Sequence, residues 1–327
     1  MTKPRRPPRR DVSWIAGTDA LARVAQPLGK LVWDSVRLHS ALAPKEAGVR
    51  IGASKLGGSP DLPKGMAWPT GELPVGKSER EIFVGFDRVR TLSSATVDLS
   101  FVAQIALADL PEFKDRKLLP KTGTLAFFYD PDSYYEKVPE ASNQAVTKDV
   151  GTGQRWASVA WADPYRVRVF HFDELLARVK PADHAPRWAA CSGTTMVVEP
   201  TLPDRESVRI DRLALRDEEA RAYSEMQSEQ NANRILHQLL GHAAYMQPYA
   251  AELSYRISHP RLFPDETRLP DKLGTPFSDR FMRPRLLLQV GSNETGMEFG
   301  RSGRLYFFIR EDDLASHDFS RVWAYEQ

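Results

Sequence analysis

The sequence has very little cysteine, no long apolar run and almost no excess charge. Its single cysteine, Cys191, excludes an intramolecular disulfide and a cysteine-based zinc cluster, and is typical of a reducing compartment. No apolar run approaches the roughly 18 residues that a membrane-spanning helix needs. The 45 Lys and Arg residues nearly balance the 43 Asp and Glu residues, so we expect no general attraction to nucleic acid or to an anionic membrane. These features predict a cytoplasmic protein that recognises its partners locally.

The start of the chain differs from the rest in composition. Lys3 to Arg10 is rich in basic residues and proline, and the apolar stretch of a secretory signal does not follow it. We expect residues 1–12 to form a disordered basic arm, with a phosphate-binding arm as the alternative. Nucleic acid is not an expected partner, except through this arm. Apolar residues at helical spacing predict a helix from Ser13 to about Arg37, within an N-terminal helical segment of residues 13–50.

One short phrase occurs twice, as Gly123-Thr-Leu-Ala-Phe-Phe and as Gly303-Arg-Leu-Tyr-Phe-Phe. Upstream of each copy, a glutamine lies inside an apolar run: Gln104 in the first copy and Gln289 in the second. This order predicts a buried strand, a loop, a Gly turn and a second buried strand in each copy. We therefore expect an internal duplication in a domain of residues 51–327, with halves of about 51–200 and 201–327 in two related sheets.

The remaining elements are predicted from local composition. The Gly- and Pro-rich segment 52–69 predicts an ordered loop without regular structure, pinned by Trp68. Residues 82–130 read as strands, and 141–169 as strand and turn. The clearest helix begins at Asp211 or Asp217 and runs towards Gln247, with Gly241 ending or interrupting it; a second helical piece is expected at 248–257. Because helices and strands are segregated, the fold class predicted is α+β with mainly antiparallel sheets and flanking helices.

A resemblance to a known family follows from an ordered series of short motifs. The series is Gly57-Gly58, Trp68-Pro69, Ala103-Gln104-Ile105, Gly123 to Phe128, His237 to Gly241, Gln247, Leu288-Gln289 and Gly303 to Ile309. With these motifs, the chain resembles the YwqG-like family, a bacterial family of unknown function, over about 54–327. The family often has Trp-Gly-Asp-x-Gly where this chain has Phe299-Gly-Arg301-Ser-Gly303, so a chemical role of that Asp would not carry over. Some relatives are associated with toxin and immunity genes, and the resemblance therefore implies an immunity or defence role as an expectation.

The most specific short motif is Gly71 to Ser78, which matches the phosphate-binding pattern G-x-x-x-x-G-K-[ST]. A phosphate-binding loop must leave a buried strand and open a helix, so that backbone N–H groups meet the phosphates. Trp68-Pro69 precedes the motif, Pro74 removes one donor, and a strand-like run follows it. We therefore expect a solvated hairpin with an exposed Lys77, and keep nucleotide binding as an alternative.

Other residues with chemical potential have simpler interpretations. His237 and His242, five apart on the predicted helix, would diverge too far to chelate a metal, so we expect neither a metal site nor a cofactor. Cys191 with His184 as base is an alternative to an incidental thiol.

The two strand glutamines lead to the candidate site. A buried amide needs hydrogen-bond partners, so Gln104 and Gln289 either fix strand register or point into a shared cleft between the halves. The candidate cleft residues are Trp68, Gln104, Gln289, Glu298 and Arg301.

The sequence favours a non-catalytic binding or interaction protein, whose partner is another protein, such as a toxin, or a small ligand. The first alternative is a hydrolase-like enzyme using carboxylates such as Glu298 and Asp312 in the cleft. The second is a nucleotide-binding protein acting through Lys77.

Overall fold

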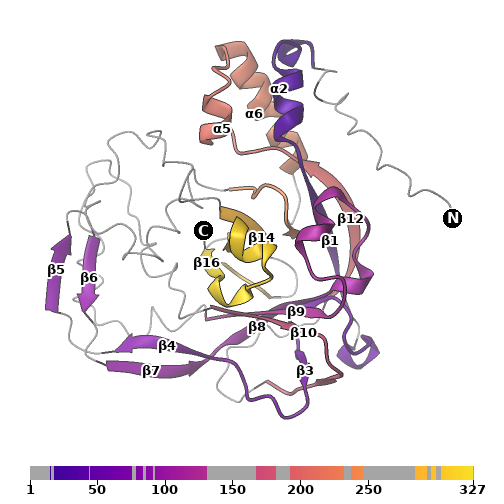
Figure 1. Cartoon of the computed structure of the whole chain (residues 1–327), viewed down its shortest axis with the longest axis vertical. Helices are drawn as coiled ribbons and strands as arrows, with labels where there is room; N and C mark the ends of the chain where they lie inside the picture. Colours follow the sequence, from indigo (N-terminus) through magenta and orange to yellow (C-terminus); the bar gives the residue numbers. More distant parts are fainter. Residues whose placement is uncertain are drawn as a thin grey trace.

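The computed structural model describes residue 15 and residues 18–43, 45–75, 79–83, 86–90, 93–130, 167–181, 192–231, 237–245, 284–292, 296–299 and 303–326. A ten-stranded sheet dominates these residues, and all its neighbouring strands are antiparallel. The helices are few, and three of the four described α-helices lie together at one end of the sheet (Figure 1). The predicted mainly antiparallel sheet with a few helices is confirmed, but the matched blocks share one sheet instead of two.

The strands of the large sheet follow this spatial order: β10 (Val167–Phe172), β9 (Thr124–Tyr129), β8 (Ser100–Ala106), β2 (Lys55–Leu56), β12 (Ser192–Thr201), β1 (Trp33–Leu42), β13 (Gln238–Leu239), β14 (Pro284–Gly291), β15 (Arg304–Arg310) and β16 (Trp323–Glu326). Three smaller pairs are β3 (Asp61–Pro63) with β11 (Leu176–Arg178), β4 (Thr70–Val75) with β7 (Ser93–Asp98), and β5 (Glu79–Phe83) with β6 (Phe86–Arg90). The α-helices are α2 (Ala25–Leu31), α5 (Val208–Asp211), α6 (Asp217–Asn231) and α8 (Glu311–Ala315). Short 3-10 helices occur at Asp19–Leu21, Glu46–Gly48, Leu107–Asp109, Lys114–Leu118 and Phe319–Arg321.

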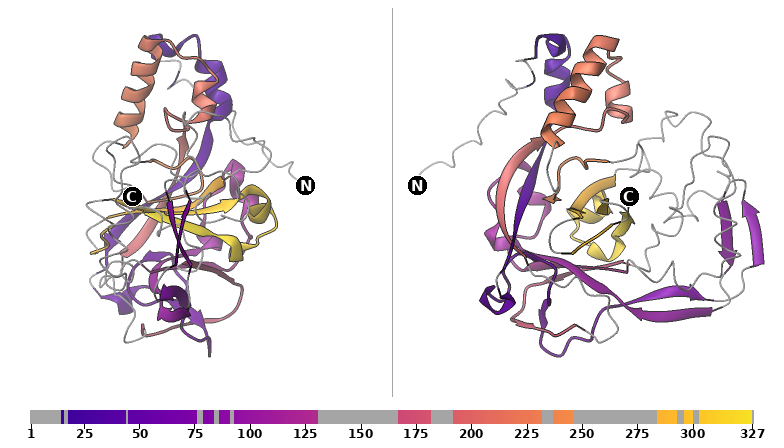
Figure 2. Two further views of the ribbon diagram at one scale, coloured as in Figure 1. Left: turned by 90° about the vertical axis from the view of Figure 1, so that its left-hand side faces the viewer. Right: turned by 180° about the vertical axis from the view of Figure 1, so that it is seen from behind.

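The large sheet curves around one apolar core (Figure 2). Phe127 of β9 contacts Phe307 of β15, with ring centroids 5.1 Å apart, although these strands lie near opposite ends of the strand order. Successive strand residues face opposite sides of a sheet, so Phe127 points into this core while Phe128 points to the outer side. Each fully buried Phe contributes about 1.5–3 kcal/mol, so the two aromatic phrases are major sources of stability.

The strand pairs that contain these phrases share a detailed irregularity. A bulge interrupts the pairing of β8 with β9, where Phe101 faces Phe128 and Ala103 faces Phe127. The pairing of β14 with β15 is interrupted at the corresponding place, where Leu286 faces Phe308 and Leu288 faces Phe307. The extra residues are Val102 and Leu287, which are both fully buried. A bulge increases the local twist of a strand pair, so both pairs bend in the same manner.

A second layer of helices covers one end of β1 and β12 (Figure 1). Helix α2 packs against α6 and its neighbours around a small core that includes Leu21, Leu28 and Tyr223. Arg23 donates two hydrogen bonds to the Glu219 carboxylate. These bonds are the main cause that lowers the pKa of Glu219 to about 2. The contact ties the N-terminal segment to the first turn of α6.

The predicted helix from Ser13 to Arg37 is wrong beyond Leu31. Residues 33–42 form β1, which pairs with β12 over its whole length, from Trp33 facing Thr201 to Leu42 facing Ser192. Val36 and Leu38 enter the main core on alternate positions. Ladder hydrogen bonds to a distant strand and the burial of residues 35–38 within the sheet outweigh the weak helical spacing.

The predicted long helix is also too long. Helix α6 ends at Asn231, and Gln238–Leu239 form β13, which pairs with both β1 and β14. Two residues are too short to carry a strand pattern in sequence, so the apolar run looked like a continued helix face. Gly241 lies in the turn after β13 and does not end a helix.

The Gly- and Pro-rich segment was expected to lack regular elements, but it contains the short strands β2 and β3. Its Trp68 is anchored as expected: the indole Nε1 donates to the Leu99 carbonyl at 3.0 Å, and the ring packs edge-on against Phe128. The acidic residues 311–313 begin the short helix α8.

Candidate functional site

The turn after β13 sets the geometry of the candidate site. Leu240 and Gly241 both have positive φ, 57° and 76°, which reverses the chain immediately after the strand. A Cβ on Gly241 would lie 2.6 Å from the Ser35 Cβ and 2.7 Å from the Thr201 Oγ1, so the close approach of β1 and β12 requires glycine here. The turn therefore places residues 242–245 against the outer side of the sheet.

Side-chain hydrogen bonds fix this loop to three strands. The Gln289 Oε1 on β14 accepts from the Ala244 N–H at 3.0 Å, and the Tyr306 hydroxyl on β15 donates to the Ala244 carbonyl at 3.0 Å. On β12, the Thr201 Oγ1 accepts from the His242 N–H at 2.8 Å. The loop is thus held at both ends by buried or half-buried groups.

A pocket of about 660 Å³ opens between this loop, the end of β12 and the last turns of α6. We call it the α6 pocket. Its described lining is mainly polar and comprises Arg37, Glu199, Pro200, Thr201, Leu202, Asp204, Ser224, Gln227, Ser228, Gln230, Asn231, Gln238, His242, Ala243, Ala244, Tyr245 and Arg304.

The charged groups of the α6 pocket carry both signs. Arg37, only 5% exposed, donates from Nε to the Glu199 carboxylate at 3.1 Å. Burial raises the pKa of the Asp204 carboxyl, although the Glu206 N–H and the Arg205 charge oppose that effect. Arg304 donates to the Ala244 carbonyl and lies within ion-pair distance of no carboxylate among the described residues. The pocket therefore has no large excess of either charge.

Gln238 contributes a hydrogen-bond acceptor to the α6 pocket. The side chain is 1% exposed, and its Nε2 donates to the His242 carbonyl at 2.7 Å and to the Leu240 carbonyl at 3.3 Å. These two bonds determine which way the amide points. The Oε1 accepts no hydrogen bond from any residue within the described ranges.

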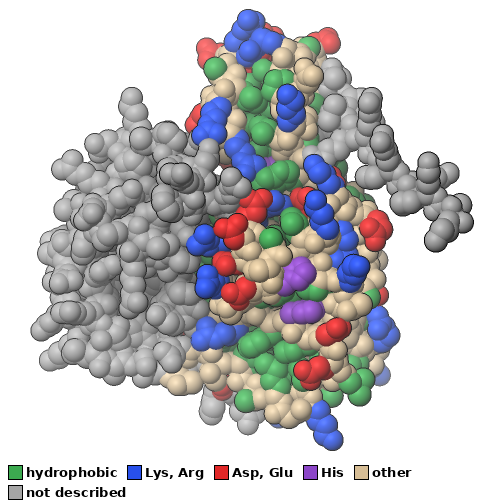
Figure 3. Space-filling model, viewed as in Figure 1, with side chains coloured by type: hydrophobic (Ala, Val, Ile, Leu, Met, Phe, Trp, Pro, Cys, Tyr) green, Lys and Arg blue, Asp and Glu red, His purple; other side chains and the backbone are tan. Residues whose placement is uncertain are grey.

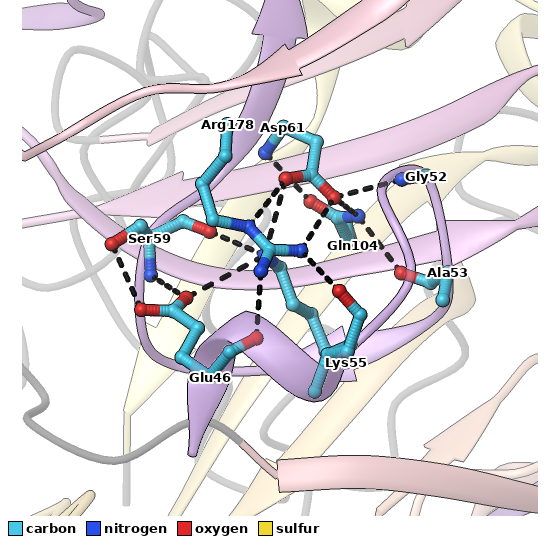
Figure 4. Close-up of polar contacts among 9 residues, drawn as sticks. Glu46, Gly52, Ala53, Lys55, Ser59, Asp61, Gln104 and Arg178 are labelled. Atoms are coloured by element: carbon cyan, nitrogen blue, oxygen red, sulfur yellow. Dashed lines mark hydrogen bonds and ion pairs between the residues drawn. The ribbon is translucent and has the colours of Figure 1, made fainter. Parts of the chain in front are cut away.

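Charged side chains fill the space beside Gln104, the strand glutamine of β8 (Figure 4). Lys55 and Asp61 are fully buried and lie 3.4 Å apart, measured from Nζ to Oδ1. Arg178 donates from Nε to the Asp61 Oδ1 at 2.9 Å, and its other nitrogens donate to the Glu46 and Val49 carbonyls. We call Glu46, Lys55, Asp61 and Arg178 the ion cluster.

The ion cluster keeps Asp61 ionised despite its burial. Burial alone would raise the pKa of the Asp61 carboxyl, but the hydrogen bond from Arg178 opposes this most strongly. The Gly52 N–H, the Gln104 amide and the charge of Lys55 act in the same direction as Arg178, and the net effect is a lowered pKa. The cluster is a satisfied, largely buried network, which indicates a structural role.

The two regions use matching hydrogen bonds. Lys55 donates to the carbonyl four residues later, at Ser59, as Gln238 donates to the carbonyl of His242. The Gln104 Oε1 accepts from the Asp61 N–H at 2.9 Å, as the Gln289 Oε1 accepts from the Ala244 N–H. Positive φ also recurs, at Gly57 and Gly58 in one region and at Leu240 and Gly241 in the other.

The two regions differ in what occupies the space beyond these shared bonds. In the first region Asp61 supplies a carboxylate that binds Arg178 and approaches Lys55. In the second region the residue that donates to the strand glutamine is Ala244, and the neighbouring space is the α6 pocket.

The structure does not bring the four described residues of the predicted cleft together. Gln104 and Gln289 lie on β8 and β14, with four strands between them, and both point away from the core that the two strand pairs share. Trp68 packs on the outer side beside Phe128, and Glu298 is exposed. Arg301 lies outside the described residues, and the described lining of the α6 pocket includes none of these five.

The two histidines are not on a helix, so the angular argument made for them does not apply. His237 precedes β13 and is 1% exposed; its Nδ1 accepts from the Gly291 N–H at 3.2 Å. Burial, aided by the charge of Arg37, lowers the pKa of His237 to about 4. His242 stacks on Trp33 with ring centroids 4.1 Å apart, and its Nε2 is 2.8 Å from the Leu31 carbonyl.

Several predicted features cannot be compared with the structure. The basic arm Lys3–Arg10, His184, Cys191 and residues 248–257 lie outside the described residues. Within the phosphate-binding pattern, Gly71 to Val75 belong to β4, which pairs with β7, and Gly76 to Ser78 lie outside the described ranges.

Sequence reasoning did not find Arg37, Glu199 and Arg304. Arg37 and Glu199 are far apart in sequence and meet only because β1 pairs with β12. Arg304 directly follows the repeated Gly, where the first copy has Thr124, so the difference between the two phrases was an available signal.

The family model described as "Domain of unknown function (DUF1963)" matches residues 54–327, which agrees with the YwqG-like resemblance. The chain matches no curated protein. Within the described ranges no helix is long and apolar enough to cross a membrane. Over the same ranges, no group of three or more His, Cys, Asp or Glu residues is placed to hold a metal ion.

Proposed function

We propose a function for a chain that belongs to DUF1963, a family described as a domain of unknown function: a non-catalytic protein that binds a small polar ligand in the α6 pocket. The open pocket is the observation that carries this proposal. Its volume of about 660 Å³ lies within the roughly 300–1,000 Å³ of small-molecule sites. The lining side chains come from strands, a helix and a loop that is fixed by hydrogen bonds, so the site is largely preformed.

The proposal includes an internal duplication, with halves at about residues 51–200 and 201–327. The equivalent bulges, the matching bonds of Gln104 and Gln289, and the recurring positive φ values support it. The ion cluster then fills the space beside Gln104 and stabilises the first half. In the second half Ala244 has a small side chain, and the corresponding space is the α6 pocket. Two copies of one framework have thereby acquired different roles.

We place this binding role in the cytoplasm, as the single cysteine predicts. On the face drawn in Figure 3, acidic and basic side chains are interspersed, which favours local recognition over attraction to a polyanion. The sequence also raised a hydrolase site at Glu298 and Asp312. Both side chains are exposed and stand outside the described lining of the pocket, so the hydrolase gains less support.

Thermal unfolding with a panel of compounds tests the proposal. The panel contains sugars, nucleotides, inorganic phosphate, amino acids and N-acetylated dipeptides. A ligand at about one hundred times its Kd stabilises the native state by about 2.7 kcal/mol, so at least one class should raise the melting temperature.

A pocket-filling variant shows where the compound binds. Ser228→Trp introduces a large side chain from α6 into the pocket and should abolish the shift. Glu225→Trp is the matched control, because it is exposed on the same helix but does not line the pocket. The proposal fails if no class raises the melting temperature, or if Ser228→Trp retains the full shift.

A further inference from the structure

We infer that the ligand of the α6 pocket carries a carboxylate beside an amide N–H, as a short peptide with a free C-terminus or an N-acylated amino acid does. This inference rests on the proposed binding function. Two side chains carry it, Arg304 as the partner of the carboxylate and Gln238 as the partner of the amide N–H.

Arg304 is a cation that lacks an anionic partner within the described ranges. Its Nη1 donates to the Ala244 carbonyl, and the side chain is half-buried in the pocket wall. A guanidinium has five N–H donors in a planar fork, of which this contact uses one. The remaining donors suit a carboxylate, which accepts two parallel hydrogen bonds from an arginine.

Gln238 offers an acceptor that a ligand N–H can satisfy. Its Nε2 is held by the His242 and Leu240 carbonyls, so the amide cannot turn over without losing both bonds. Its Oε1 has no donor among the described residues, and the side chain lines the pocket, so this oxygen is open to a ligand. An amide oxygen held in a fixed direction accepts a hydrogen bond, and a peptide N–H is a suitable donor.

The two groups are held by two carbonyls of the same short loop. Gln238 is held by the carbonyl of His242 and Arg304 by the carbonyl of Ala244. Two residues of chain span at most about 7 Å, so the two anchoring carbonyls lie close together. A C-terminal residue carries an amide N–H and a carboxylate next to each other, and this matches two groups that are anchored so near to each other.

The other charges of the pocket disfavour a phosphate. Glu199 is paired with Arg37, and Asp204 adds a second carboxylate to the lining. Arg304 is then the one Lys or Arg of the described lining without a carboxylate partner, and its single charge matches a singly charged carboxylate better than a doubly charged phosphate. The ring of Tyr245, supported by Tyr306 and Phe308, supplies an apolar wall for a ligand side chain.

The test is calorimetric titration of the full chain with N-acetylated dipeptides whose C-terminal side chains are small, aromatic or charged. Each dipeptide is compared with its C-terminal amide, and AMP and inorganic phosphate are titrated separately. We expect amidation of the best dipeptide to weaken binding at least tenfold, because it removes the charge that faces Arg304.

Variants assign the effect to the two side chains. Arg304→Gln should weaken binding of the acid at least tenfold and make acid and amide bind equally. Arg310→Gln, at the other end of β15 and outside the described lining, should leave the affinity unchanged. Gln238→Glu should also weaken binding, because it places a third carboxylate beside the ligand. If Arg304→Gln fails to fold, the comparison of acid with amide on the unaltered chain still decides.

Three results would overturn the inference: equal affinity for acid and amide, tighter binding of AMP or phosphate, or no binding of any dipeptide. If another panel class binds and Ser228→Trp abolishes that binding, the proposed function stands while the ligand class is wrong. If nothing binds in the pocket, both fail.

Discussion

Replacing Gly241 by alanine tests whether the turn after β13 is set by close packing. The residue has φ of 76°, and a non-glycine residue in this region costs about 1–2 kcal/mol. A Cβ here would also lie 2.6 Å from the Ser35 Cβ, whereas carbon atoms prefer about 3.5–4.0 Å. Overpacking of this kind typically costs a further 1–3 kcal/mol, so we expect a total loss of about 2–5 kcal/mol.

Gly52→Ala separates the two contributions to that loss. Gly52 has the same φ of 76°, but nothing lies within 4 Å of the position of its Cβ. We therefore expect Gly52→Ala to cost only the conformational part, about 1–2 kcal/mol. Urea unfolding followed by circular dichroism measures both variants, and an unchanged m-value indicates that the native and unfolded states are comparable. Equal losses for the two variants would refute the packing argument, and Gly65→Ala, also free of neighbours, is a second control.

Two further predictions concern buried ionisable groups. His237 has its pKa lowered from 6.5 to about 4, mainly by burial, so the unfolded chain binds more protons between these values and stability falls as the pH drops through this window. The loss should be about 2.5 kcal/mol by about pH 4.5, and urea unfolding of His237→Gln should lack this part of the pH dependence. Asp61→Asn leaves Lys55, which is fully buried, without its closest carboxylate and should cost about 3–5 kcal/mol. Asp109→Asn, which breaks an exposed pair with Arg50, should cost less than about 1 kcal/mol by the same assay, and a similar loss in both would contradict the assigned role of the ion cluster.

Much of the sheet could be predicted because its strands carry local signals. The run around Gln104 and the phrase after Gly123 are continuous apolar segments opened by turn residues, and both form buried strands. The requirement that each buried glutamine be hydrogen-bonded also held, since Gln104 and Gln289 both accept from backbone N–H groups. These features depend on a few neighbouring residues, so a single sequence reveals them.

The parts that were missed depend on residues that are distant in sequence. Strand β13 has two residues and exists because β1 and β14 lie on either side of it. Residues 33–37 were assigned to a helix, although Val36 gains more from pairing beside β12 than from helix formation. The α6 pocket combines Arg37, Gln238 and Arg304 from three separate strands, and no local pattern indicates that they meet.

The pairing of β1 with β12 has a consequence for how the chain folds. The two strands lie in the middle of the strand order, so their pairing joins the part from β10 to β12 to the part from β1 to β16. They pair Trp33 with Thr201 at one end and Leu42 with Ser192 at the other. On the ribosome, β1 is synthesised early but has no partner until β12 emerges, whereas β8 and β9 can pair as soon as they are made. Contacts between such distant residues slow folding, because the loop-closure entropy is lost before the contacts form. We therefore expect the seam between β1 and β12 to close late, and β1 to be the strand most exposed to mispairing with another chain during synthesis.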